Sequence, residues 1–229
     1  MLQAALNGAW GPGESAVVPR DPAGLAAAAA DAVAAGAREV RIRPRTPCGG
    51  ASLSPRVVGP ALTAVRSAVR VPVAVAVDAW AEPDPARRVA RIRAWEELPD
   101  LAWVAWHEPG AEETAAALLA RGVAVEAGLR AGTAGADLFA RSPAARVRRI
   151  VAEAPDDGAG PWALALAAAH GPVPVLLHGT GPAAWPVLRL ARRLGLDGRI
   201  GLEDTLSLPD GTRAGSTAEQ VRAALSDRS

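Results

Sequence analysis

Short runs of hydrophobic residues alternate with longer alanine-rich segments along the whole chain. Such short, mostly apolar runs are typical of parallel strands that helices cover. The pattern predicts eight strands, at Leu2–Asn7, Arg38–Arg43, Val71–Val77, Leu101–His107, Val123–Leu129, Val147–Glu153, Val173–His178 and Arg199–Glu203. The segments between them predict helices near residues 22–36, 55–69, 85–97, 110–121, 131–141, 160–170, 181–195 and 217–226.

Residues at the helix boundaries support this assignment. Three helices are expected to begin with a capping residue followed by proline, at Asp21-Pro22, Ser54-Pro55 and Asp84-Pro85. Glycine, which readily adopts the left-handed conformation that ends a helix, stands at positions 36, 122 and 195. Each of these glycines lies where a predicted helix should stop.

The predicted order of elements indicates the α/β class and a single (β/α)8 TIM barrel over residues 1–229. Eight strand–helix units average about 29 residues each, close to the length of a βαβ unit. The alternative is an open doubly wound sheet. That alternative is weakened because no G-x-G-x-x-G motif follows a predicted strand.

Composition excludes several functions. The net charge is +1, from 25 basic and 24 acidic residues, which gives no sign of binding to nucleic acid or to a membrane surface. All basic residues are arginine, so aldolase chemistry through a lysine Schiff base is excluded. Cys48 is the single cysteine, which rules out an intramolecular disulfide and a cysteine-rich zinc module. With no leader-like or membrane-spanning segment, a cytoplasmic protein is expected.

Polar residues gather at the carboxyl ends of the predicted strands, where barrel enzymes carry their active sites. These residues are Asn7, Arg41, Arg43, Asp78, His107, Glu108, Glu126, His178, Glu203 and Asp204. A plain apolar core would not need them, so they predict a site. The tryptophans are expected to pack in the core.

Arg41 and Arg43 lie two residues apart on a strand and therefore share a face. Directed inward, their guanidinium groups could bind a carboxylate or phosphate through two hydrogen bonds. They could equally form a structural network with Glu203 or Glu126. Directed outward, they would only touch a helix, and the anion site would fail.

The remaining candidates also have two interpretations each. His107 and His178 are either acid–base groups or metal ligands, or they are structural hydrogen-bonding groups. Glu126 lies within a strand and needs a cation or a substrate as its partner. Glu203 and Asp204 are adjacent strand residues by prediction, so one should enter the site and the other should brace a loop.

Several of these segments resemble one family from end to end. They include ALNGA, AGAREVRIRPR, VDAW, WVAWHEPGAEE, GVAVEAGL and LLHGTGPAAWPVLRLARRLGLDGRIGLEDTLSLPDG. The chain resembles the beta-keto acid cleavage enzymes, a group that includes 3-keto-5-aminohexanoate cleavage enzyme. The resemblance implies a (β/α)8 barrel and a homo-oligomer.

The resemblance also implies an activity. Family members cleave a beta-keto acid against acetyl-CoA, giving acetoacetate and a new acyl-CoA, and zinc polarises the keto group. A small-molecule carboxylate and acetyl-CoA would therefore be the ligands of this chain. By motif, Glu203 matches the metal-binding glutamate, Asp204 an acid–base residue and Arg199 an arginine that assists it. Glu126 matches a carboxylate near the polar end of the substrate.

The chain departs from the family pattern at the metal site. Two histidines that hold zinc in the family are Arg41 and Arg43 here. A guanidinium group only donates hydrogen bonds, so neither arginine can ligate zinc. We therefore expect no metal cofactor, with Glu203 as the one ligand position carried over. Substrate-binding roles are assigned to Asn7, Arg41, Arg43, Asp78, His107 and His178.

Three hypotheses follow. In the first, the protein is an enzyme in which the arginine pair replaces the charge of the metal. In the second, Arg41 and Arg43 neutralise Glu203 in a non-catalytic homologue that binds a small anion or acts as a subunit. In the third, zinc binds through His107, His178 and Glu203 from three different strands.

Overall fold

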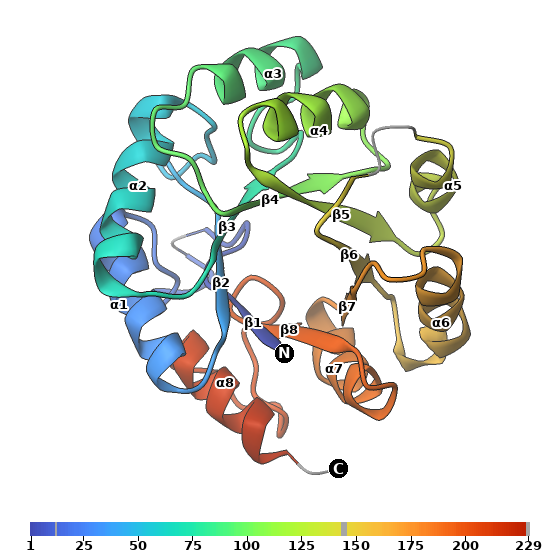
Figure 1. The fold of residues 1–229 in the computed structure, drawn as a ribbon. Coiled ribbons are helices and arrows are strands. Elements are labelled where there is room, and N and C mark those ends of the chain that lie inside the picture. The colour runs from blue at the N-terminus through green and yellow to red at the C-terminus, as the bar shows by residue number, and fades with distance from the viewer. Residues whose placement is uncertain (12, 143–145, 228–229) are drawn as a thin grey trace.

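The computed structural model describes residues 1–11, 13–142 and 146–227. Eight parallel strands pair in chain order, and β1 also pairs with β8, so the sheet closes into a barrel ringed by helices (Figure 1). The strands are β1 (Leu2–Ala5), β2 (Glu39–Ile42), β3 (Val73–Val77), β4 (Leu101–Ala105), β5 (Ala124–Arg130), β6 (Arg149–Glu153), β7 (Val175–His178) and β8 (Asp197–Ile200). The prediction of a (β/α)8 TIM barrel is confirmed.

One helix follows each strand. They are α1 (Pro22–Ala34), α2 (Pro55–Ala68), α3 (Pro85–Arg93), α4 (Ala111–Ala120), α5 (Gly135–Ala140), α6 (Gly160–Ala169), α7 (Ala184–Arg193) and α8 (Thr217–Ser226), with short 3-10 turns η1 (Asp157–Ala159) and η2 (Gly181–Ala183). Asp21 caps α1 by accepting from the Gly24 amide at 2.8 Å, and Asp84 caps α3 by accepting from the Arg87 amide at 2.9 Å. Within the described ranges, Ser54 makes no such side-chain bond to α2.

The last strand differs most from its prediction. We expected it at Arg199–Glu203, but β8 spans Asp197–Ile200. The chain then turns at once, because the amides of Asp204 and Thr205 both donate to the Gly201 carbonyl, at 2.9 and 3.1 Å. Glu203 and Asp204 therefore lie in this turn above the barrel and not in the strand.

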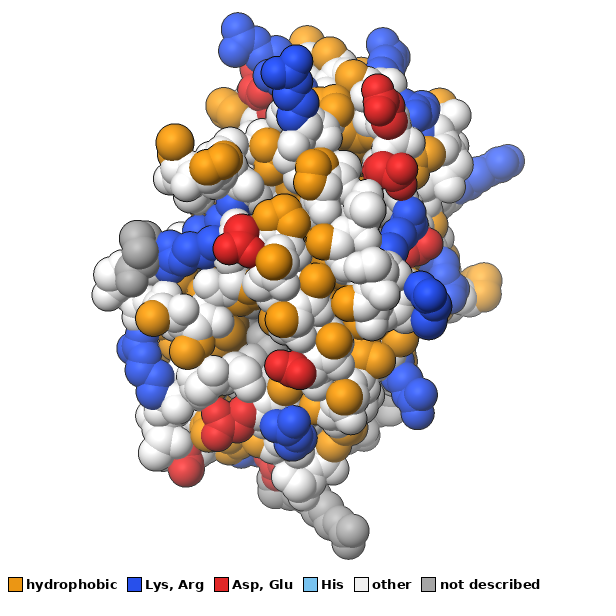
Figure 2. Space-filling model, turned by 90° about the vertical axis from the view of Figure 1, so that its left-hand side faces the viewer, with side chains coloured by type: hydrophobic (Ala, Val, Ile, Leu, Met, Phe, Trp, Pro, Cys, Tyr) orange, Lys and Arg blue, Asp and Glu red, His pale blue; other side chains and the backbone are white. Residues whose placement is uncertain are grey.

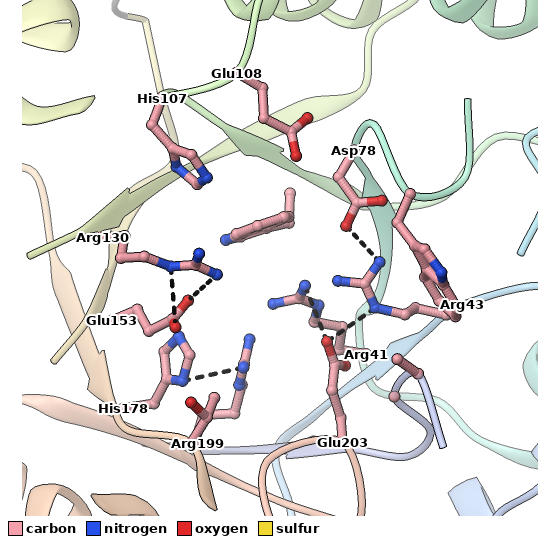
Figure 3. A pocket seen from close by; sticks show the side chains of 15 residues that line it. Arg41, Arg43, Asp78, His107, Glu108, Arg130, Glu153, His178, Arg199 and Glu203 are labelled. Carbon is pink, nitrogen blue, oxygen red and sulfur yellow. Dashed lines mark hydrogen bonds and ion pairs between the residues drawn. The ribbon is translucent and has the colours of Figure 1, made fainter. Parts of the chain in front are cut away.

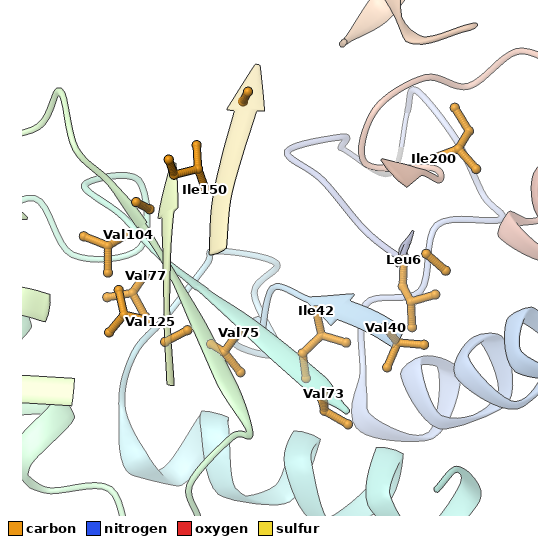
Figure 4. Packing of buried hydrophobic residues seen from close by; sticks show 14 of the residues in the cluster. Leu6, Val40, Ile42, Val73, Val75, Val77, Val104, Val125, Ile150 and Ile200 are labelled. Atoms are coloured by element: carbon orange, nitrogen blue, oxygen red, sulfur yellow. The ribbon is translucent and has the colours of Figure 1, made fainter. Parts of the chain in front are cut away.

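Side chains alternate between the two faces of each strand, as the strand period of two requires. On β3, Val73, Val75 and Val77 point outward and join the large hydrophobic cluster beneath the helices, together with residues such as Val40 and Val104 (Figure 4). The inward positions carry a different set of side chains. A small apolar layer lies inside the barrel, made by Ala76, Trp103, Ala105, Val151 and Leu176. Buried polar side chains such as Arg41, Glu126 and Arg149 occupy further inward positions.

One polar layer closes the amino-terminal end of the barrel. The Arg149 Nε donates to Glu126 Oε1 at 2.7 Å, and its Nη2 forms ion pairs with both Glu126 and Glu39. The Gln3 amide donates to Glu39 Oε1 at 2.5 Å. Burial raises the pKa of Glu39 despite the opposing charge of Arg149. Glu126 is fully buried, and Arg149 is the cation that it needs as a partner.

One face of the outer surface carries many hydrophobic side chains. Figure 2 shows the side that carries α1 and α2, where hydrophobic side chains spread through the middle and charged ones lie mostly toward the edges. Helix α1 is rich in alanine, so each exposed apolar side chain there is small. No helix in residues 1–11, 13–142 or 146–227 is long and apolar enough to cross a membrane.

The polar layer predicts a large effect of removing its cation. Arg149→Met would leave two buried carboxylates without a positive partner, and we expect a loss of about 3–5 kcal/mol in the free energy of unfolding. Urea unfolding measures this. Adding Glu39→Gln and Glu126→Gln to Arg149→Met should recover part of the loss, since neutral amides need no cation. If the unfolding free energy of Arg149→Met lay within about 1 kcal/mol of the wild-type value, the role of Arg149 as the partner of both carboxylates would be contradicted.

Candidate functional site

A cavity of about 340 Å³ opens at the carboxyl ends of the strands. Its charged and histidine side chains are Arg41, Arg43, Asp78, His107, Glu108, Arg130, Glu153, His178, Arg199 and Glu203, which converge on the centre of Figure 3. Gly8, Ala9, Trp80, Trp103 and Thr180 complete the lining. The cavity lies where a barrel of this kind carries its active site.

Both arginines of β2 and its following loop point into the barrel. Arg41 Nη2 lies 3.2 Å from Glu203 Oε1, and Arg43 Nε donates to the same oxygen at 3.0 Å. Arg43 Nη1 also forms an ion pair with Asp78. The alternative that the pair faces a helix is therefore wrong.

Glu203 is held as an anion between these arginines. Burial alone would raise its pKa, but the charges of Arg41, Arg43 and Arg199 outweigh burial and keep the pKa below its usual range. The same holds for Asp78, where Arg43 outweighs the effect of burial and lowers the pKa. Glu203 and Asp78 are thus held as anionic partners of the arginines.

Arg41 is only partly satisfied by these contacts. It is 1% exposed, and among the described residues neither its Nε nor its Nη1 has a hydrogen-bond partner. Burial lowers the pKa of Arg41 to about 10, which leaves it cationic at neutral pH. A buried donor without an acceptor costs free energy, so these two nitrogens favour an anionic ligand with acceptor oxygens.

Two tryptophans belong to the site, although we expected them to serve only in packing. The Arg41 guanidinium carbon lies 4.4 Å from the centroid of the Trp103 ring, and that of Arg43 lies 5.3 Å from the Trp80 ring. Both distances suit cation–π contact. Gly128 on β5 makes room for Trp103, because a Cβ atom there would overlap the indole.

Arg199 on β8 links a carboxylate to a histidine. Its Nη2 donates to Asp204 Oδ1 at 2.5 Å and also lies 3.0 Å from Nδ1 of His178. Burial alone would raise the pKa of Asp204, but chiefly the charge of Arg199 lowers it to about 2. Glu203 and Asp204 thus both bond to arginines inside the barrel. Glu203 enters the cavity, as expected for one of the two, but the Asp204 carboxylate binds Arg199 and does not brace a loop.

Sequence reasoning missed Arg130 and Glu153 at the rim, whereas Glu108, which the strand ends had indicated, does line the cavity. Arg130 binds both oxygens of Glu153, at 3.1 and 3.2 Å. Glu108 accepts from the Ala79 amide at 2.7 Å and lies 3.5 Å from Arg88. Burial raises the pKa of Glu108. The strand period contained a usable signal, because Arg130 lies four residues after Glu126 on β5 and so shares its inward face.

Not all the predicted residues reach the cavity. Those that line it are Arg41, Arg43, Asp78, His107, His178, Arg199 and Glu203. Within the described part of the chain, Asn7, Glu126 and Asp204 are not among the lining residues. The Asn7 side chain binds the backbone of Arg43 twice. Its Nδ2 donates to the Arg43 carbonyl at 2.9 Å, and its Oδ1 accepts from the Arg43 backbone N–H at 2.9 Å. Glu126 lies in the amino-terminal polar layer, and Asp204 contacts the cavity only through Arg199 and His178.

The fold and site define a TIM barrel with a charged cavity at its carboxyl end. The sequence profile of the beta-keto acid cleavage enzyme family matches residues 1–161 and 157–226. The chain therefore belongs to the beta-keto acid cleavage enzyme family. No curated protein sequence matches the chain significantly.

Solved structures share the fold. Apo ObcA matches with a TM-score of 0.72 at 15% identity, over 91% of this chain and 61% of that chain. A ternary complex of ObcA with a C4-CoA adduct and oxalate matches with a TM-score of 0.69 at 15% identity, over 91% and 63%. A truncated 3-deoxy-D-arabino-heptulosonate 7-phosphate synthase from Thermotoga maritima matches with a TM-score of 0.55 at 13% identity, over 98% and 84%. The chain thus spans about three fifths of the length of ObcA.

The donor set does not suit a zinc ion. In the described residues, no three His, Cys, Asp or Glu side chains are placed to hold a metal. The hypothesis of a site made by His107, His178 and Glu203 is therefore wrong for this structure. Arg41 and Arg43 direct donors at Glu203, and a guanidinium donor cannot ligate a cation.

The lowered pKa of Asp204 predicts a pH-dependent stability. An acid whose pKa falls from 3.8 to about 2 on folding adds stability that is present above the unfolded value and lost as the pH falls through the folded one. Asp204→Asn removes this contribution. The difference in unfolding free energy between wild type and variant should therefore shrink by about 2 kcal/mol from pH 5 to pH 2.

Urea unfolding at a series of pH values measures this difference. Asp31→Asn is the matched control, because Asp31 is an exposed carboxylate on α1 away from the cavity. A difference between wild type and Asp204→Asn that stays constant with pH would contradict the Arg199–Asp204 pairing.

Proposed function

We propose that this protein cleaves a beta-keto acid and transfers its acyl group to coenzyme A, with arginine charge in place of a metal ion. In this reaction R–CO–CH2–COO⁻ and acetyl-CoA give acetoacetate and R–CO–CoA. The bond between C2 and C3 of the acid breaks, and its CH2–COO⁻ unit joins the acetyl group. The proposal also includes a homo-oligomeric assembly, as the family resemblance implies.

The observation that carries this proposal is the state of Arg41. Its two unpartnered nitrogens, buried above Trp103, suit the oxygens of a carboxylate or of an enolate formed from it. Fixed positive charge in an enclosed site stabilises developing negative charge strongly. Arg41 and Arg43 would supply this stabilisation where other family members use a metal.

The carboxylates then divide between two roles. Asp204, with a pKa of about 2, is a weak base, so we assign it the task of positioning Arg199, which in turn contacts His178. Glu108 lines the cavity and has a raised pKa, which suits a group that accepts the proton from C2 of the substrate. Glu203 keeps the two arginines in place.

The ObcA complex supports the class of ligand. That protein binds a C4-CoA adduct and oxalate in a barrel of the same fold. A small carboxylate and an acyl-CoA are therefore reasonable partners for this chain. The proposal that acetyl-CoA is the co-substrate rests on the family.

A second function is favoured by the ion pairs themselves. Glu203 and Asp78 already compensate Arg41 and Arg43 without any ligand. A non-catalytic homologue with this arrangement would bind a small anion and release it unchanged. It would bind carboxylates but form no acyl-CoA.

Removing the Arg41 charge tests the proposal. Wild type incubated with acetyl-CoA and a panel of beta-keto acids should form new acyl-CoA, detected by mass spectrometry. Arg41→Met should lower kcat/KM by about 100-fold or more, as removal of one transition-state donor does. The matched control is Arg38→Met, an exposed arginine outside the cavity, which should keep full activity. Carboxylate binding without acyl-CoA formation by the wild type would support the non-catalytic alternative.

Metal content gives an independent test. Wild-type activity should survive dialysis against a chelator, and elemental analysis should find far less than one zinc per chain. The double variant Arg41→His, Arg43→His presents two imidazole ligands beside Glu203 and should bind zinc. One zinc per wild-type chain, with activity lost on chelation, would contradict the metal-independent part of the proposal.

A further inference from the structure

His178 at the end of β7 carries a buried nitrogen that the proposed chemistry has not used. The residue is 1% exposed and lines the cavity. Among the residues that the structure describes, its Nε2 has no hydrogen-bond partner. A buried polar atom of this kind at a cavity wall indicates contact with a ligand.

The neighbours of Nδ1 determine which nitrogen carries the hydrogen. Arg199 Nη2 lies 3.0 Å from Nδ1, and a guanidinium group can only donate. Asp204 Oδ1 lies 3.6 Å from Nδ1, which is too far for a hydrogen bond. Nδ1 is therefore an acceptor, and the hydrogen of the neutral ring is on Nε2.

The surroundings also keep the ring neutral. Burial and then the charge of Arg199 lower the pKa of His178, and they outweigh the carboxylates of Asp204 and Glu153. Glu153 faces His178 from the adjacent strand β6, but both of its oxygens bind Arg130. His178 is thus a neutral donor with its hydrogen on the atom that has no partner.

We propose that the Nε2–H group of His178 donates a hydrogen bond to the keto oxygen of the bound beta-keto acid. This inference rests on the proposed function and names the group that recognises the keto function. Figure 3 shows His178 across the cavity from Arg43, with the Arg41 guanidinium between them. The arginines would take the carboxylate, and His178 would take the keto oxygen. A neutral imidazole donor stabilises negative charge on that oxygen without transferring a proton.

Two ligands allow the keto contact of His178 to be tested apart from the carboxylate contact of the arginines. Acetoacetate and butyrate have the same carboxylate and the same number of carbons, but only acetoacetate carries a keto oxygen at C3. In calorimetric titrations, His178→Leu should weaken acetoacetate binding by about tenfold, as expected for one lost hydrogen bond. It should leave butyrate binding within about twofold. His178→Gln, whose amide can donate near the Nε2 position, should recover part of the acetoacetate affinity. The control is His170→Leu, at the end of α6 and outside the cavity.

Nitrogen NMR tests the same inference without any turnover. In protein labelled with 15N, the His178 ring, assigned by its loss in His178→Gln, should show the neutral Nε2-protonated form from pH 7 to 8. Its Nε2 signal should shift with acetoacetate and not with butyrate. An Nδ1-protonated ring, or an imidazolium in this range, would overturn the inference.

The outcomes distinguish this inference from the proposed function. Equal losses for both ligands in His178→Leu, or no recovery in His178→Gln, would overturn the role of His178 and leave carboxylate binding intact. If neither ligand binds to the wild type, the proposed function itself fails.

Discussion

Ion pairing inside a closed barrel is the constraint on which the rest of this structure depends. Each strand sends every second side chain inward, so a charged residue at such a position cannot reach water unless it lies near the mouth. Arg149 is therefore paired with Glu39 and Glu126 at the amino-terminal end. Near the carboxyl end, Arg41 and Arg43 share Glu203, and Arg199 holds Asp204. The pairs that stabilise the barrel and those that shape the cavity follow the same physical rule.

Within the described residues, the ion pairs leave some polar atoms at the cavity without a hydrogen-bond partner. Arg41 and His178 each retain a donor atom that no described residue accepts from. Both residues line the cavity, from β2 and β7, and in the proposed complex they bind two oxygens of one small molecule. Trp103 excludes water beneath Arg41, and a lower local dielectric strengthens any charge interaction there. A beta-keto acid carries acceptors suited to both donors.

The metal-independent part of the proposed function rests on Arg41 and Arg43, which stand where the sequence resemblance implies ligand histidines. Glu203, which matches a metal ligand by motif, neutralises guanidinium groups here instead. The positive charge therefore remains at the site, but it is now covalently part of the chain. A guanidinium group stabilises an anion through directed hydrogen bonds, whereas a metal ion accepts lone pairs from several ligands at once. In the proposed reaction, directed hydrogen bonds from arginine would take the role that metal coordination has in the family.

The sequence by itself determined the barrel and most of the cavity lining. Apolar runs alternating with helical segments predicted all eight strands, and the spacing of Arg41 and Arg43 placed them on one face. The ends of the strands were predicted less accurately. Strand β8 stops where hydrogen bonds to the Gly201 carbonyl form a turn, and no local sequence pattern predicts these bonds. Glu126 looked like a site residue because it is an isolated carboxylate in a strand. Only the tertiary structure showed Arg149 beside it, since inward side chains from separate strands meet by barrel closure and not by sequence spacing.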